Sequence, residues 1–115
     1  YIEDNPSNLR LVTQIFSRYS NVNLLTASNG QRGLEVILEC NPDLIMTDVN
    51  MPGLSGFDVL NQLKLLDDYV NIPVFAVSAN AMPEEINKAL NEGFSDYITK
   101  PINIDKLLTS LGEFL

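Results

Sequence analysis

Two kinds of apolar pattern alternate along the chain. Short apolar runs bounded by turn residues predict buried strands at residues 1–3, 21–27, 44–48, 72–77 and 95–99. Between these runs, apolar residues recur at spacings of three and four, which predicts five amphipathic helices. The apolar positions of these helices are Leu9, Val12, Phe16 and Tyr19, then Leu34, Ile37 and Leu38, then Phe57, Leu60 and Leu63, with a fourth helix opened by Pro83-Glu84-Glu85 and a fifth marked by Ile104, Leu107, Leu108 and Leu111. This alternation predicts an α/β fold with right-handed crossovers and a doubly wound, five-stranded parallel sheet.

Polar residues whose side chains could bind a ligand or take part in a reaction follow several of the predicted strands. The central run ends at Asp48, just before a Pro-Gly turn, and Glu3-Asp4 follows the first run. Ser78 and Lys100 follow the fourth and fifth runs. A lone Asp before Pro-Gly commonly does no more than end a strand. Because ligand chemistry in open α/β sheets lies at the carboxyl ends of the strands, the additional groups favour a functional site around Asp48.

The predicted carboxylates would repel one another at that edge. At about 5 Å and an effective dielectric constant of about 20, each pair costs about 3 kcal/mol before salt screening. Mg²⁺ is the natural compensating cation, because it prefers a few carboxylate and carbonyl oxygens and often bridges to phosphoryl groups. Glu3, Asp4 and Asp48 would supply oxygens. Asp48 could then attack phosphorus, while Lys100 and the Ser78 hydroxyl stabilise the transferred group.

Composition narrows the possible partners and location. The 115 residues fit one domain, 1–115, and we expect its first strand to be truncated, because the chain begins so close to Glu3. Fifteen acids against seven bases give a net charge of -8, which argues against direct contact with nucleic acid or an anionic membrane. No apolar run approaches the about 18 residues of a membrane span. The single Cys40 predicts a small core residue and a reducing, cytoplasmic setting.

Taken together in this order and spacing, the motifs have a family resemblance. They are Glu3-Asp4, the loop from Asp48 to Gly56, Ser78-Ala79, Tyr97 and Lys100-Pro101. The whole chain resembles a receiver domain of two-component response regulators, most closely those of hybrid histidine kinases. The resemblance implies a flavodoxin-like fold with strand order 2-1-3-4-5. It also implies a phosphoacceptor signalling domain whose only catalysis is its own phosphorylation and dephosphorylation, in a parent chain that could be a hybrid histidine kinase.

The resemblance also implies a role for each matching residue. Asp48 accepts a phosphoryl group from a phosphohistidine, with Lys100 and Ser78 assisting. Asp4 and Asp48 bind Mg²⁺ together with the Asn50 backbone carbonyl, and Glu3 acts mostly through water. Ser78 and Tyr97 form the switch that moves the face around the fourth helix and fifth strand. The Lys100–Pro101 peptide bond is expected to be cis.

The donor must be another protein domain, because the chain contains no His. The resemblance implies a histidine kinase or a histidine phosphotransfer domain. Its contact surface is expected on the first helix, near Asn8, Leu9 and Val12, together with the loop after Lys100.

Three alternatives remain open from the residues. A haloacid-dehalogenase-like phosphatase also uses an Asp nucleophile and Mg²⁺, but it expects a second Asp where this chain has Asn50. A flavodoxin-like FMN carrier needs a Gly- and Thr-containing phosphate loop, which residues 5–8 do not supply. The third alternative is a receiver-like module that binds partners without accepting phosphate.

Overall fold

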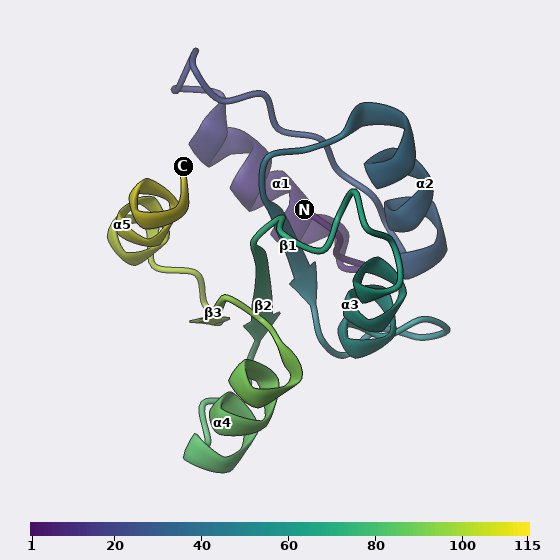
Figure 1. Cartoon of the computed structure of the whole chain (residues 1–115). Coiled ribbons are helices and arrows are strands. Elements are labelled where there is room, and N and C mark those ends of the chain that lie inside the picture. The colour runs from purple at the N-terminus through teal and green to yellow at the C-terminus, as the bar shows by residue number, and fades with distance from the viewer.

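The computed structural model describes all 115 residues and contains helices and strands in alternation (Figure 1). The elements are α1 (Pro6–Phe16), α2 (Gly30–Cys40), β1 (Ile45–Asp48), α3 (Gly56–Lys64), β2 (Val74–Ser78), α4 (Pro83–Glu92), β3 (Asp96–Thr99) and α5 (Ile104–Phe114). All five predicted helices are present. None of them combines the length and apolarity that a membrane span requires.

The sheet is parallel, with β1, β2 and β3 side by side in that order. Ile2 forms parallel bridges to Thr47 on one side and to Ala27 on the other. The five segments therefore lie in the predicted order 2-1-3-4-5, and the flavodoxin-like arrangement is confirmed. The first two predicted strands are reduced to these bridges at Ile2 and Ala27.

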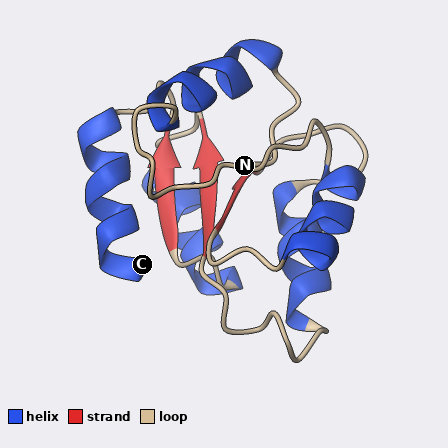
Figure 2. Ribbon diagram, turned by 90° about the horizontal axis from the view of Figure 1, so that it is seen from above, coloured by secondary structure: helices blue, strands red, loops and turns tan.

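Helices cover both faces of the sheet (Figure 2). Successive strand residues point to opposite faces, so Val74 and Ala76 belong to one apolar cluster while Phe75 and Val77 belong to the other. The first cluster includes residues of α2, α3 and α4, and the second includes residues of α1 and α5. Both faces of β1 and β2 are thus buried, as expected for a doubly wound parallel sheet, whereas the edge strand β3 is only partly buried.

Four positions predicted as apolar or core are exposed: Tyr19, Leu38, Cys40 and Ile104, the first residue of α5. Cys40 is exposed, so its prediction as a small core residue is wrong. It is the last residue of α2, and Asn41 immediately turns the chain with a left-handed backbone (φ 48°). Leu38 is half exposed because the buried face of α2 is formed by Gly30, Gly33 and Ile37. Tyr19 lies beyond the end of α1 and is also exposed.

Candidate functional site

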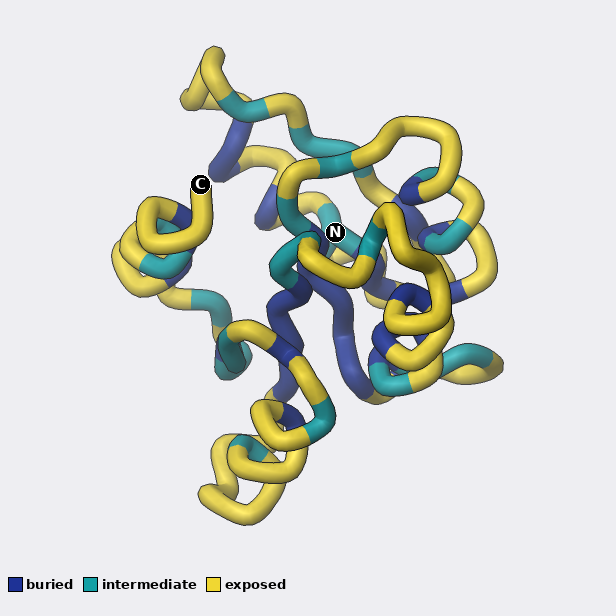
Figure 3. Tube along the Cα trace, in the orientation of Figure 1, coloured by how far each residue is buried: buried dark blue, intermediate teal, exposed yellow.

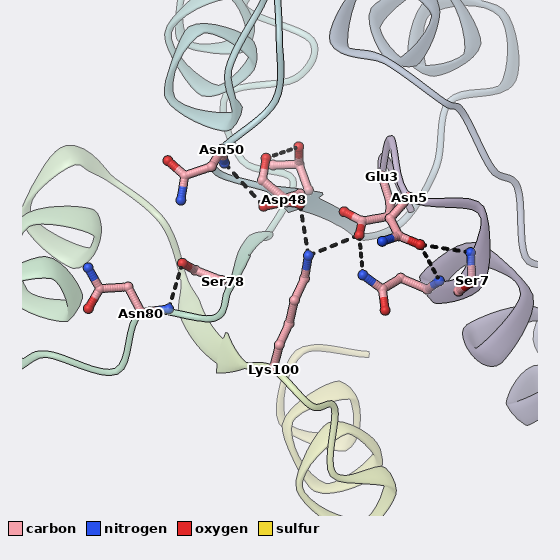
Figure 4. Close-up of polar contacts among 10 residues, drawn as sticks. Glu3, Asn5, Ser7, Asp48, Asn50, Ser78, Asn80 and Lys100 are labelled. Atoms are coloured by element: carbon pink, nitrogen blue, oxygen red, sulfur yellow. Dashed lines mark hydrogen bonds and ion pairs between the residues drawn. The ribbon is translucent and has the colours of Figure 1, made fainter.

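Four polar side chains lie at the carboxyl edge of the sheet, and three of them, from Glu3, Asp48 and Lys100, contact one another (Figure 4). Asp48 and Ser78 are the last residues of β1 and β2, and Lys100 directly follows β3. The parallel register pairs Asp48 with Val77 and Ser78 with Thr99, so these strand ends are level. Glu3 follows the bridged residue Ile2 and reaches the same edge. The structure therefore brings together residues that are up to 97 positions apart in sequence.

One amine lies between two buried carboxylates. Lys100 Nζ donates to Asp48 Oδ2 at 2.8 Å and to Glu3 Oε1 at 2.9 Å. Glu3 is completely buried, and Asp48 is nearly so. The Lys100–Pro101 peptide bond is cis, as predicted. The lysine therefore neutralises part of the charge that burial makes costly.

The two carboxylates differ in their electrostatic setting. Burial and the neighbouring Asp48 raise the pKa of Glu3, and hydrogen bonds from Asn8 and Lys100 only partly oppose this. Burial acts to raise the pKa of Asp48 as well, but its interactions with Glu3, Lys100 and the Asn50 N–H outweigh burial and lower that pKa. Burial acts to lower the pKa of Lys100, whereas both carboxylates raise it above its ordinary value. Asp48 is thus the carboxylate of this pair that is better held as an anion.

The acids at this edge also fit a hard cation. Carboxylate oxygens of Glu3, Asp4 and Asp48 lie within 4.8 Å of one another. Glu3 Oε2 is buried and has no hydrogen-bond partner, which leaves an uncompensated oxygen facing this group. An all-oxygen set of this kind matches the preference of Mg²⁺. Asn50 is adjacent, since its backbone N–H donates to Asp48 Oδ1 at 3.1 Å.

Glycines hold the loop after β1 close to Asp48. Gly53 adopts a left-handed backbone (φ 76°), which a residue with a side chain rarely adopts. At Gly56, the first residue of α3, an added Cβ would lie 2.5 Å from the Asp48 carbonyl oxygen. Ser55 and Asp58 cap the start of α3 by bonding each other's backbone N–H groups. The loop is therefore closed back onto the backbone of the candidate nucleophile.

Asn8 is a site residue that was predicted only as part of a contact surface. Its side-chain Nδ2 donates to Glu3 Oε1 at 2.5 Å. The signal is local, because Asn5 caps α1 by accepting from the Ser7 N–H at 2.8 Å, and this turn brings the Asn8 side chain to Glu3. An Asn in the first turn after an acidic pair is thus positioned to bond back to it.

Ser78 and Tyr97 are connected through a residue between them. Ser78 is buried, and its Oγ accepts from the Asn80 N–H at 3.1 Å. The Tyr97 hydroxyl donates to the Asn80 carbonyl oxygen at 2.7 Å, and the ring packs against the core cluster of α2, α3 and α4. The two predicted switch residues therefore share Asn80, which was not among the predicted site residues.

Known sequences are similar to this chain along almost its entire length, and they include receiver domains. The family profile described as "Response regulator receiver domain" matches residues 1–112. Hybrid signal transduction histidine kinase D of Dictyostelium discoideum is 36% identical over 114 residues, which are 99% of this chain but 7% of that protein. The polar-differentiation response regulator DivK of Brucella anthropi is 32% identical over 114 residues, covering 99% of this chain and 92% of DivK.

A solved structure supports the fold. The receiver domain of a sensor histidine kinase from Pseudomonas aeruginosa, described with a magnesium ion in its active-site cleft, superimposes with a TM-score of 0.86 at 23% identity. The alignment covers 98% of this chain and 92% of that domain. The profile match and the two relatives lead to one conclusion: this chain belongs to the response regulator receiver domain family of two-component signalling.

Proposed function

We propose that Asp48 accepts a phosphoryl group from a phosphohistidine of another domain, in a Mg²⁺-dependent reaction in the cytoplasm. The observation that carries this proposal is the Lys100 amine between Asp48 and Glu3 at a buried strand edge. Asp48 is the acid at the end of the central strand, and its lowered pKa keeps it ionised at neutral pH. The family membership supplies the signalling context.

The transfer is a substitution at phosphorus. A carboxylate oxygen of Asp48 forms a new O–P bond while the P–N bond of the donor breaks. The electron pair of that bond returns to the imidazole nitrogen, so the leaving group is the histidine side chain of the donor. In the product, Lys100 balances the added negative charge, and the Ser78 hydroxyl donates to a phosphoryl oxygen. Burial of the edge strengthens both interactions.

Asp4, Asp48 and the Asn50 carbonyl would hold the metal, and Glu3 would act mostly through water. When bound, Mg²⁺ supplies positive charge that neutralises the phosphoryl oxygens. The clustered carboxylates and the unpartnered Glu3 oxygen support this assignment. The magnesium described for the related Pseudomonas domain agrees with it.

Ser78 and Tyr97 would then transmit the modification. The phosphoryl group adds roughly 1.5 to 2 negative charges and draws the Ser78 hydroxyl toward it. That movement alters the hydrogen bond from Asn80 to Ser78, and the bond from Tyr97 to Asn80 conveys the change to β3. The responding face is the one around α4 and β3.

Intact mass spectrometry tests the phosphorylation site. The chain is incubated with acetyl phosphate, with either Mg²⁺ or EDTA. We expect one added phosphoryl group in the wild type with Mg²⁺, and none in Asp48→Asn. Asp67→Asn, which removes an exposed acid after α3, is the matched control and should be labelled normally. Undiminished labelling of Asp48→Asn would refute the assignment.

The donor contact is expected on a groove between α1 and the start of α5. Val12 is fully buried and cannot contact a partner, so this part of the predicted surface is wrong. Leu11 and Ile104 are 40% and 45% exposed and line the groove, together with Gln14, Ile15, Arg18 and Tyr19. We propose that a histidine kinase or histidine phosphotransfer domain docks there with a small, transient interface of under about 1,200 Å².

Leu11→Asp tests this docking surface. It should slow transfer from a phosphorylated histidine phosphotransfer domain that labels the wild type, while labelling by acetyl phosphate stays unchanged. Leu65→Asp places the same charge on an exposed leucine beyond α3 and serves as the control. Equal slowing with both donors would show that Leu11 supports the fold and not the docking.

A further inference from the structure

α4 is the least embedded helix of the domain. It lies apart from the other helices in Figure 1, and almost all of it is exposed in Figure 3. Ala89 is its only buried residue, whereas four residues of α3 are buried. α4 must therefore depend on a small number of specific attachments to keep its position.

The first attachment is at the beginning of α4. Met82, the residue before the helix, makes no side-chain cap. Its backbone N–H instead donates to Asn80 Oδ1 at 2.9 Å. Asn80 is the same residue that bonds Ser78 and Tyr97 through its backbone. The start of α4 is thus linked to the carboxyl edge of the sheet, where Ser78 lies beside the proposed phosphoacceptor Asp48; we call this the phosphoacceptor edge.

The second attachment is at the opposite end of α4. Lys64 Nζ donates to the carbonyl oxygen of Glu92, the last residue of the helix. Gly93 follows with a left-handed backbone (φ 121°), and a Cβ there would lie 2.9 Å from Lys64 Cε. Lys64 is itself the last residue of α3, so one cation lies at the negative poles of two helices.

Aromatic contacts tie the same end of α4 to α3. The Phe57 ring packs edge to face on Phe94 with centroids 5.4 Å apart. Lys88 Nζ lies 5.1 Å from the centre of the Phe57 ring. The end of α4 is therefore held by α3, which carries no residue of the phosphoacceptor edge, while its start is held by Asn80.

We propose that α4 works as a lever, with the Lys64–Glu92 contact as its fixed pivot and Asn80 as its movable end. This inference rests on the proposed phosphorylation of Asp48. When the Ser78 hydroxyl turns to the phosphoryl group, the hydrogen bonds of Asn80 to Ser78, Tyr97 and Met82 rearrange, and the start of the helix is released. The end stays bound to Lys64, so the helix tilts and keeps its contact with α3. Lys64 is thus a positioning residue for the responding face around α4 and β3.

Amide hydrogen exchange, read along α4, tests the pivot in two steps. In the unphosphorylated chain, Lys64→Met keeps the apolar stem but removes the donor, and we expect roughly two- to fivefold faster exchange at residues 90–93. Lys64→Arg should restore much of the protection. Lys106→Met removes an exposed cation of α5 and should leave α4 unchanged. This step does not involve Asp48, so it is independent of the proposed function.

The second step compares each protein with and without acetyl phosphate and Mg²⁺. In the wild type, exchange should change at residues 79–86 and stay constant at residues 90–93. In Lys64→Met the change should extend along the whole helix, although labelling of Asp48 remains normal. Normal labelling with equal changes at both ends of wild-type α4, or unaltered exchange in unphosphorylated Lys64→Met, would overturn the pivot. Absence of labelling in the wild type would overturn the proposed function, and with it the phosphorylation-driven tilt.

Discussion

The carboxyl edge of the sheet and the core cluster behind it are both buried, but burial has opposite energetic consequences in the two regions. In the cluster of α1, α5 and the strands, Val12, Phe75 and Leu107 are fully buried among apolar side chains, and their burial stabilises the fold. At the edge, Glu3 is equally buried but carries a charge and an oxygen without a partner. Desolvation there opposes folding. Stability and chemistry therefore reside in neighbouring but separable sets of residues.

The largest stability effect is expected in the core. Leu107→Ala removes a fully buried side chain of α5 and should lower the free energy of unfolding by about 2 to 5 kcal/mol. Urea denaturation measures this loss. The fraction that remains folded should still be labelled by acetyl phosphate, because no site contact is removed. A folded but unlabelled variant would show that the two regions are not separable.

The second effect concerns the cation of the edge. Lys100→Met leaves two buried carboxylates without their shared amine and should destabilise the metal-free protein by about 1 to 3 kcal/mol. Thermal unfolding in EDTA measures this. Adding Mg²⁺ should raise the melting temperature more in Lys100→Met than in the wild type, because a second cation then compensates the acids. Identical Mg²⁺ responses would contradict the fit of the acids to a metal.

A smaller effect of the opposite sign is expected at Glu3. Glu3→Gln removes a carboxyl group whose pKa is raised by burial, and the new amide can donate toward Asp48. The metal-free protein should therefore become more stable by about 1 kcal/mol. The gain should be measured by urea denaturation in EDTA. A clear loss of stability would mean that the Glu3 charge, and not only its shape, is needed to hold Lys100.

The smallest effect is expected at Asn5, which lies beside the site but serves the fold. Asn5→Ala removes the cap of α1 and should cost about 0.5 to 1 kcal/mol. Labelling by acetyl phosphate should be unaffected. Asn5→Asp, which preserves the capping oxygen, is the matched control. A drop in the labelling rate with Asn5→Ala alone would show that the cap also positions Asn8 against Glu3, so that this residue serves both the fold and the site.

The sequence patterns anticipated much of this arrangement. Strand periodicity and strand-end polarity were sufficient to place Asp48, Ser78 and Lys100 at one edge, because parallel register leaves few other outcomes. Helical periodicity located all five helices, but it could not exclude Leu38 from the core. A residue on the border of an apolar stripe is buried only if a neighbouring element covers it.

Contacts that depend on loop conformation were not predictable in the same way. Asn8 meets Glu3 only because Asn5 turns the start of α1, and Asn80 joins Ser78 and Tyr97 through backbone atoms that any residue would offer. The Lys64 contact depends on the relative placement of two helices. No spacing in the sequence encodes such a distance.

The exposed position of Cys40 has a practical consequence for measuring these motions. It is the only thiol of the chain, and it lies at the end of α2, next to the amino end of β1 and therefore opposite Asp48. A fluorophore or spin label attached there would leave the phosphoacceptor edge untouched. With Leu90→Cys as a second attachment point on the exposed side of α4, the label-to-label distance would record helix movement in solution directly.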